Sequence, residues 1–438
     1  MKNILIVSSL ISILVLSGCS RSGKPRPGKI DLNDIQKSTL TSEQKAEKMA
    51  LAGEQLVSPV SFMYADYVFD QALVQDSKNF RAQFYKALLA QVVVYRGIVK
   101  RVEPYIKTQS TKVEQNRYDR WIKNQPNSGL KSFLLDNSNL PDIKDEKSFQ
   151  AFLDTVTAGY ETYRTFLKTN KNSMNLTLNV NDSKEISRRV KAGKEECSWK
   201  NPEPGIYDPS ECVLTDVLEI KVDQADAEVM QQVAAGMEMY HIMLNSYDMS
   251  GLINANKVLP ENATPAQIFA YLNQIPDFGQ LRSEQKLGRV TEMGSDVVAG
   301  MKYAMENYKM LCPEGTHTEK ARKGHIIENS ICMYDVNVPD SKNRVEKLIA
   351  SMTQILGGGV VLGKVGHDIR DDSIVTANFN YTALLKNPVQ DLKKQFPTSF
   401  NRCGNPVALA DKTMGGLYAD GDAEDKLTRT GKLGASCE

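Results

Sequence analysis

Apolar side chains recur every three or four residues along most of this chain, and this spacing predicts a mainly α-helical protein. The first helix is expected to start at Thr41, and the next two to cover about Ser61–Gln75 and Ala82–Val102. A later helix should end at Gly357–Gly358–Gly359, because glycine commonly terminates helices. The other helices are expected over Ser148–Leu167, Ala225–Met249, Thr264–Gln274, Glu284–Leu311 and Val345–Leu356.

In two parts of the chain the period changes to two, which indicates β-strands. Apolar and polar residues alternate from Met174 to Val180, and Val213–Val222 also has the composition of an extended segment. We expect these two segments to form a small ribbon inserted into the helical body at about 173–222. The C-terminal region is expected to be mixed, with extended segments over Val360–Val365 and Ile374–Tyr381 and a short helix from Asn387 to Phe396.

The polar stretch 107–145 separates two helical parts of the chain. It is rich in Asn, Ser, Gln and Pro and holds a lone tryptophan, Trp121, so it is either a boundary or a long, partly helical insertion. The expected organisation is a leader at 1–18, a tether at 19–40, paired helices at 41–106, a polar connection at 107–145, a helical body at 146–356 and a mixed region at 357–438.

The start of the chain has the pattern of a secretory signal. Lys2 is followed by the apolar run Ile4–Leu16, which is too short to span a membrane. The ending Leu16–Ser17–Gly18–Cys19 resembles the lipobox of bacterial lipoproteins. That resemblance implies cleavage before Cys19, acylation of its thiol and anchoring in a membrane. By the sorting rule of such lipoproteins, Ser20 favours the outer membrane, with the body facing the periplasm.

The residues after the lipobox, Ser20–Lys29, are rich in Gly, Pro and basic side chains. This composition is typical of a flexible tether. We interpret the segment as a solvated linker, whose positive charges can also meet anionic lipid headgroups.

The first two predicted helices resemble a tetratricopeptide repeat. The matching residues are Gly53, then Ala65-x3-Phe69-x2-Ala72, and then Asp76–Ser77 where the family has Asp-Pro. Small residues at Gly53 and Ala65 let the helices approach, and Phe69 fills the gap between them. The family's Trp, Leu and Tyr of the first helix are replaced by Met49, Ala52 and Leu56, and the match covers under a quarter of the chain.

Repeats of this family present concave surfaces that hold peptides or partner helices. The resemblance therefore implies a partner-binding groove, which we place on the tyrosines of the N-terminal helices. These are Tyr64, Tyr67, Tyr85 and Tyr95.

The chain has seven cysteines, and six remain if Cys19 carries lipid. An even number in an exported protein predicts disulfide bonds rather than free thiols. Neighbours along the chain suggest the pairs Cys197–Cys212, Cys312–Cys332 and Cys403–Cys437. A zinc site is disfavoured, because no two cysteines have C-x-x-C spacing and no two histidines lie at ligand spacing.

Charge and compartment exclude several classes of ligand. Lys and Arg number 54 and Asp and Glu 53, so neither sign dominates and no nucleic-acid partner is predicted. Gly358-x4-Gly363–Lys364 has the spacing of a phosphate-binding loop. Such a loop follows a strand and has Ser or Thr after the lysine, whereas here a helix precedes and Val365 follows. We expect a helix end and a turn instead, with no nucleotide and no cofactor.

Two clusters have ligand types that metals accept. The acidic run Asp420–Asp425 lacks the glycine and glutamate positions of a calcium loop, so a solvated turn is favoured over an irregular calcium site. Met237-x-Met239-x-His241-x-Met243 offers soft ligands suited to Cu(I). On a helix these side chains fall on different faces, so packing in the core is favoured over copper binding.

No catalytic motif is evident. The chain lacks G-x-S-x-G and H-E-x-x-H sequences. His317, His325 and His367 stand isolated among Lys, Gly and Asp, which is typical of surface loops rather than of a general base. A cell-envelope hydrolase built from scattered residues is the least favoured function.

The sequence thus predicts a lipid-anchored envelope protein that acts as a partner-binding scaffold or accessory subunit in envelope assembly or transport. The competing interpretation is a solute- or glycan-binding lipoprotein, with its site at the loop that holds Trp199 and Tyr207. Exposed aromatic rings of this kind stack on sugars.

Lipidation is directly testable. Cys19→Ala should leave a protein that is unprocessed or unanchored, because the acylated thiol is lost. Membrane fractionation and intact mass measure both effects. A variant with unchanged fractionation and an unchanged mass, apart from the substitution, would show that the lipobox prediction is wrong.

Overall fold

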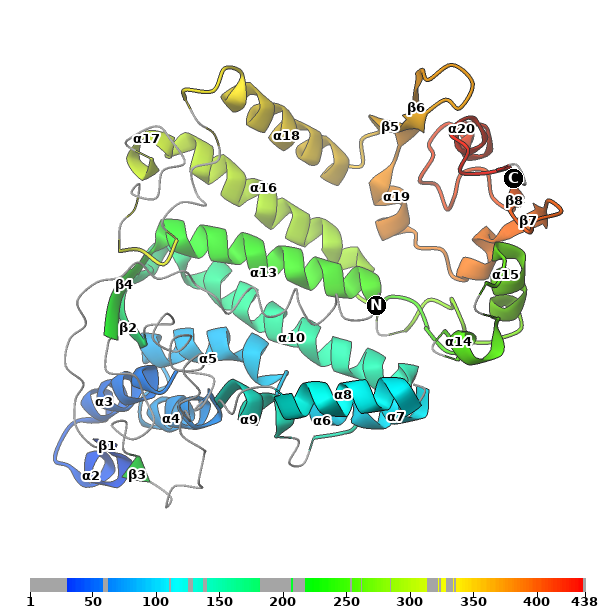
Figure 1. Ribbon diagram of the computed structural model, residues 1–438. Coiled ribbons are helices and arrows are strands. Elements are labelled where there is room, and N and C mark those ends of the chain that lie inside the picture. Colours follow the sequence, from blue (N-terminus) through cyan, green and yellow to red (C-terminus); the bar gives the residue numbers. More distant parts are fainter. Residues whose placement is uncertain are drawn as a thin grey trace.

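The computed structural model describes most of the chain (Figure 1). It is mostly helical, with small two-stranded antiparallel sheets, which confirms the prediction of a mainly helical fold. The tetratricopeptide-like pairing and the disulfide bonds stay predictions. The described residues are 30–57, 62–109, 112–124, 129–136, 140–181, 206–207, 217–252, 254–260, 262–283, 285–312, 322, 324–327, 334 and 336–435. Among them, no helix is both long enough and apolar enough to cross a membrane.

Three N-terminal helices pack together in chain order (Figure 1). Thr41 caps the first of them with a capping box, since its hydroxyl accepts from the Gln44 amide while the Gln44 side chain accepts from the Thr41 amide. Gly53 lies so close to the Phe69 ring that a Cβ there would stand 2.7 Å from it. This is the close approach that the sequence predicts. The helices are α3 (Ser42–Gln55), α4 (Phe62–Gln75) and α5 (Phe80–Val93), preceded by the short α2 (Leu32–Lys37).

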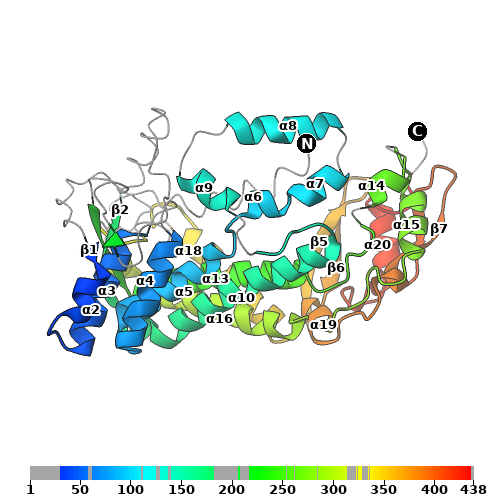
Figure 2. The same cartoon turned by 90° about the horizontal axis from the view of Figure 1, so that it is seen from below.

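The polar stretch after these helices is largely helical. Figure 2 shows its longest helix, α8 (Lys112–Asn124), standing apart from the layer that holds the main body. No residue of α8 is buried. Around it lie α6 (Ile98–Arg101), α7 (Glu103–Gln109) and α9 (Gly129–Leu135). The domain boundaries given above remain predictions.

The centre of the molecule is formed by three long helices, α10 (Glu146–Asn170), α13 (Gln224–Leu244) and α16 (Val290–Glu306), which lie side by side in Figure 1. Arg164 of α10 is almost completely buried and joins all three. Its Nε donates to Glu238 of α13 at 2.6 Å, and its Nη1 donates to Asp296 of α16 at 2.8 Å.

The predicted ribbon is present. Strands β2 (Asn175–Asn181) and β4 (Val217–Asp223) pair antiparallel, with Leu178 opposite Ile220. Leu176 and Leu178 are buried, as the alternation requires. A second short pair joins β1 (Ile30–Asp31) to β3 (Ile206–Tyr207).

The remaining helices surround the end of this body. Helix α18 packs along α16 and is capped by Gly357, where the sequence predicts the helix end. The elements are α14 (Ala255–Val258), α15 (Pro265–Asn273), α17 (Tyr308–Leu311) and α18 (Ser341–Leu356), with 3-10 turns at Lys171–Ser173 and Leu287–Arg289.

The C-terminal region is mixed, as predicted, but one helix differs. The helix expected from Asn387 to Phe396 is reduced to a 3-10 turn at its end, Leu392–Gln395. Before it, residues 390 and 391 pair with residues 280 and 281, with the Leu281 amide donating to the Gln390 carbonyl at 2.8 Å. The strand expected to reach Tyr381 also ends earlier, because the Asn380 side chain caps a new helix. The elements are β5 (Val361–His367), β6 (Ile374–Phe379), α19 (Tyr381–Lys386), a 3-10 turn (Leu392–Gln395), β7 (Pro397–Phe400), β8 (Pro406–Leu409) and α20 (Ala423–Arg429).

The contact between Gly53 and Phe69 gives a testable pair of substitutions. Gly53→Ala should destabilise the fold by ~1–3 kcal/mol, because the buried Phe69 ring stacks on Tyr85 and has no room to move. Gly236→Ala in α13 is the control, since a Cβ there meets nothing within 4 Å. It should be neutral or stabilising by up to about 1 kcal/mol. Chemical denaturation of both variants measures this, and equal stabilities would contradict the close approach.

Candidate functional site

A cluster of ionisable side chains sits where β4 ends and α13 begins. Asp223 caps α13, and its Oδ1 accepts from the amides of Ala225 and Asp226. The Asp226 side chain in turn accepts from the Asp223 amide at 2.9 Å. This capping box places two carboxylates next to each other at the start of the helix.

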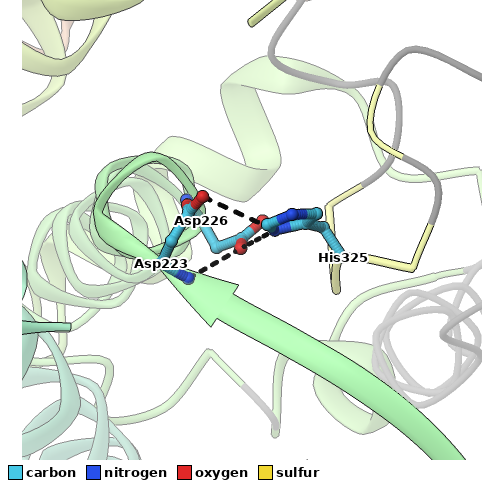
Figure 3. A group of neighbouring side chains, drawn as sticks. All are labelled: Asp223, Asp226 and His325. Carbon is cyan, nitrogen blue, oxygen red and sulfur yellow. Dashed lines mark hydrogen bonds and ion pairs between the residues drawn. The ribbon is translucent and has the colours of Figure 1, made fainter. Parts of the chain in front are cut away.

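Arg322 and His325, about 100 residues further along the chain, contact these carboxylates. Figure 3 shows His325 beside Asp223 and Asp226. Arg322 donates through Nη1 to Asp226 Oδ1 at 2.9 Å and through Nη2 to Asp223 Oδ2 at 2.5 Å. His325 Nδ1 lies 3.0 Å from Asp226 Oδ2 and 2.9 Å from Arg322 Nη2. We call these four residues the Arg322 clamp.

Backbone bonds hold the segment of Arg322 and His325 in place. The Lys221 amide donates to the Gly324 carbonyl at 2.8 Å, and the Ile326 amide donates to the Lys221 carbonyl at 3.0 Å. The Ile327 amide reaches Asp226 Oδ1 at 3.2 Å. The segment therefore lies beside the end of β4 and is bound through both its backbone and its side chains.

The pKa values of the two carboxyl groups of the clamp are shifted in opposite directions. Burial raises the pKa of Asp226, and the attraction of Arg322 and the contact with His325 offset this only in part. Burial also raises the pKa of Asp223, but the hydrogen bonds from Arg322 and the Asp226 amide, together with the attraction of Arg322 and His325, outweigh it and leave that pKa below its ordinary value. Asp226 is thus the member whose negative charge depends most on Arg322.

The clamp has the residue types of a metal site, but an arginine stands where a metal ion would bind. Ligand atoms of Asp223, Asp226 and His325 lie within 4.8 Å of one another. Arg322, however, already occupies the place of a cation and forms charge-assisted bonds to both carboxylates. A metal ion would have to displace this guanidinium from a buried position. The geometry therefore supports a structural clamp that holds residues 322–327 on the body.

The sequence prediction for His325 was wrong. It is half-buried and paired with a carboxylate about 100 residues away along the chain, rather than isolated in a surface loop. His367 contacts Asp372 Oδ1 at 3.1 Å and is largely exposed, and His317 lies outside the described residues. The one local signal for the clamp was the Asp-x-x-Asp spacing at the predicted helix start.

The other candidate metal and phosphate motifs have structural roles. His241 stacks on Tyr160 at 5.5 Å and its Nδ1 lies 2.7 Å from the Met237 carbonyl, so it is a packed residue, and burial lowers its pKa. The core packing predicted for the Met–His motif is wrong for Met243, which is 47% exposed. Gly363 and Lys364 lie in strand β5 rather than in a phosphate loop. The acidic run at 420–425 leads into α20, with Asp422 accepting from Lys426 at 3.0 Å.

The predicted tyrosine groove does not form as a common surface. Tyr85 is buried and stacks on Phe69 with ring centres 4.8 Å apart, and Tyr64 is also buried. Tyr95 is half-buried against Phe152. Only Tyr67 exposes about half of its side chain, at 48%. Packing of the helices buries Tyr64 and Tyr85 and half-buries Tyr95. These three rings therefore stabilise the N-terminal helices instead of lining a groove.

The predicted ligand loop and disulfide bonds lie mostly outside the described residues. Trp199 is outside them, and of Tyr207 the structure describes the backbone pairing with Ile30. Cys312 is buried, and Cys403 donates its amide to Asn401. Cys19, Cys197, Cys212, Cys332 and Cys437 are outside, so the lipidation and the three disulfide pairs stay predictions.

One open groove lies between α16 and α18. Its lining mixes apolar and charged side chains, and no set of polar groups converges on its centre as in an enzyme pocket. The lining residues are Lys302, Met305, Glu306, Glu346, Ile349, Ala350, Thr353 and Gln354.

The surface of α13 has an unusual distribution of residue types. Its three acidic residues, Asp226, Glu228 and Glu238, are 0%, 4% and 0% exposed. Every exposed position of α13 is instead apolar, namely Val233 (53%), Tyr240 (53%), Met243 (47%) and Leu244 (40%). An ordinary surface helix has the reverse arrangement, with charges outside.

These exposed residues form one continuous stripe. Val233, Tyr240 and Met243 follow each other at steps of seven and three residues, with the half-buried Gly236 between the first two, which places all four on one side of the helix. We call this stripe, together with Leu244, the outer face of α13. Exposed apolar patches of this kind mark interaction surfaces.

Comparison with known proteins gives no family for this chain. No protein-family model matches it, and neither a curated protein nor a solved structure matches it. The function is therefore argued from the chain's own residues.

The structural role of the Arg322 clamp is testable. Arg322→Ala should destabilise the fold by ~3–5 kcal/mol, because it removes the guanidinium that neutralises the buried Asp226 carboxylate. Adding Asp226→Asn to this variant should recover part of the loss, since the unpaired charge is then gone. Arg344→Ala on the exposed side of α18 is the control and should change stability by less than ~0.5 kcal/mol.

Urea unfolding of the four proteins measures these values, and melting with zinc or a chelator adds a second test. We expect neither to move the melting temperature of the wild-type protein. A zinc-dependent rise that disappears in His325→Ala would contradict the clamp and identify a metal site.

Proposed function

We propose that this protein is a lipid-anchored envelope protein that acts as a partner-binding scaffold or accessory subunit, and that the outer face of α13 is its binding surface. The proposal rests on one observation: Val233, Tyr240 and Met243 are exposed on the central helix, and no exposed residue of this helix is charged. Water-exposed apolar area of this extent is unfavourable in a monomer and becomes favourable when a partner covers it.

The ionisable clusters support binding rather than catalysis. Within the described residues, the buried acids of the main body face basic side chains that neutralise them, as Glu238 faces Arg164 and Glu228 faces Lys171 at 2.9 Å. A general base or nucleophile needs access to substrate, and these groups are closed to solvent. Their role is to hold helices together.

The sequence features complete the proposal. A lipobox at Cys19 supplies the membrane anchor, the cysteine pairs supply disulfide bonds, and the close approach of Gly53 to Phe69 supports a tetratricopeptide-like pairing of α3 and α4. An anchored helical body with an open apolar surface suits assembly or transport at the outer membrane. The apolar character of the surface identifies its partner as an amphipathic helix or another apolar surface.

Photo-crosslinking from the outer face tests the proposal. The full anchored chain with benzoylphenylalanine at position 240 should give a crosslinked species in intact cells, because the probe replaces the exposed Tyr240. Val233→Lys in the same chain should abolish the species, since it places a charge in the covered surface. The matched controls are the same probe at Thr162 and the same lysine at Thr162, an exposed position of α10. Equal adducts at positions 162 and 240, or none at 240, would contradict this binding surface.

A further inference from the structure

We propose that the outer face of α13 binds a second copy of the same chain, with the two α13 helices antiparallel and crossing at Gly236. This inference rests on the proposed function, because it names the partner of the same surface. It is carried by the pattern of the stripe, by the open space at Gly236 and by the charges of the helix.

The two most exposed residues of the stripe lie almost symmetrically about Gly236. Val233 stands three residues before it and Tyr240 four residues after it. An antiparallel pair with a twofold axis close to Gly236 therefore places Val233 against Tyr240 of the second copy. A twofold interface requires such self-complementarity, since each contact occurs twice.

Gly236 has no role within a single copy. A Cβ at this position meets nothing within 4 Å, and alanine is the better helix former in a helix interior. Glycine at a helix position with open space beside it is explained if another backbone approaches there. In Gly53 the same chain shows what such an approach looks like, because there the Phe69 ring fills the space above the glycine.

Charge also favours an identical partner. The exposed positions of α13 carry no charge, so two copies can meet without like-charge repulsion. A membrane surface would instead favour Lys or Arg beside the apolar stripe, and α13 has no basic residue other than His241, which is buried. A charged partner would find no opposite charge along this face.

The size of the stripe sets the strength of the dimer. The part of α13 from Val233 to Met243 spans about 15 Å, and its exposed apolar area is on the order of a few hundred Å² per copy. Two such faces fall below the roughly 1,200–2,000 Å² of stable interfaces, so the pair is weak in solution. Anchoring both copies in one membrane raises their effective concentration and favours the pair.

Substitutions that place charges at positions 233 and 240 of the two copies test the antiparallel crossing. Two differently tagged full-length chains are produced in one membrane, crosslinked chemically, and one tag is captured. Val233→Lys on both copies, or Tyr240→Glu on both, should lower co-capture about tenfold or more, because each buries unpaired charges. Val233→Lys on one copy with Tyr240→Glu on the other should restore most of it, since residues 233 and 240 then face each other with opposite charges.

Matched controls distinguish the alternatives. Val233→Lys with Val233→Glu should not restore co-capture, and restoration by this pair would show a parallel arrangement and overturn the crossing proposed here. Gly236→Leu should abolish co-capture while the melting temperature of the chain stays at least as high, because the position is open in a single copy.

The crosslink at position 240 separates this inference from the proposed function. An adduct of twice the chain mass that carries both tags supports self-pairing. An adduct with a different protein that Val233→Lys abolishes would overturn self-pairing and leave the scaffold function standing. No adduct at this position would overturn both.

Discussion

The structure depends on one buried charge, the guanidinium of Arg164. It lies at the meeting point of α10, α13 and α16 and bonds to Glu238 and Asp296, one from each of the other two helices. Burial lowers the pKa of an arginine, and here the bonds to these carboxylates more than offset that effect and leave the pKa of Arg164 raised. Removing one partner of such a group costs ~3–5 kcal/mol, because the remaining charges stay buried without compensation. The three helices are therefore fixed in one arrangement.

This arrangement explains why the acidic residues of α13 are buried while apolar residues are exposed on its surface. Each of its acidic residues binds a different part of the molecule: Asp226 holds Arg322, Glu228 holds Lys171, and Glu238 holds Arg164 and, at 3.3 Å, Arg289. With all of its charges used in the interior, α13 has only apolar side chains left for its outer side. The stripe of Val233, Tyr240 and Met243 is thus the counterpart of the buried network.

Local pattern predicts the elements of this fold but not their electrostatic connections. The helix spacing, the two-residue period of the β2–β4 ribbon and the Gly53–Phe69 approach all arise between residues close in sequence, and each was predictable. Arg164 and Glu238 are 74 residues apart, and Asp226 and Arg322 are 96 apart. A single sequence does not show which distant charges meet. For the same reason Asp226 and Glu238 look like ordinary surface residues before the fold is known.

The same limit accounts for the tyrosine prediction and for the surface that replaces it. Tyr64 and Tyr85 were placed on a groove because the tetratricopeptide resemblance implies one, yet tight packing of α3, α4 and α5 turned them into the core. On α13, in contrast, Val233 and Tyr240 are exposed although both are large and largely apolar. Because the acids of α13 point inward, no charged side chain covers its exposed apolar residues, and the most direct way to bury those residues is another apolar helix. The binding surface of this protein follows from its buried charges, and the N-terminal helix pair then serves to build the body that presents it.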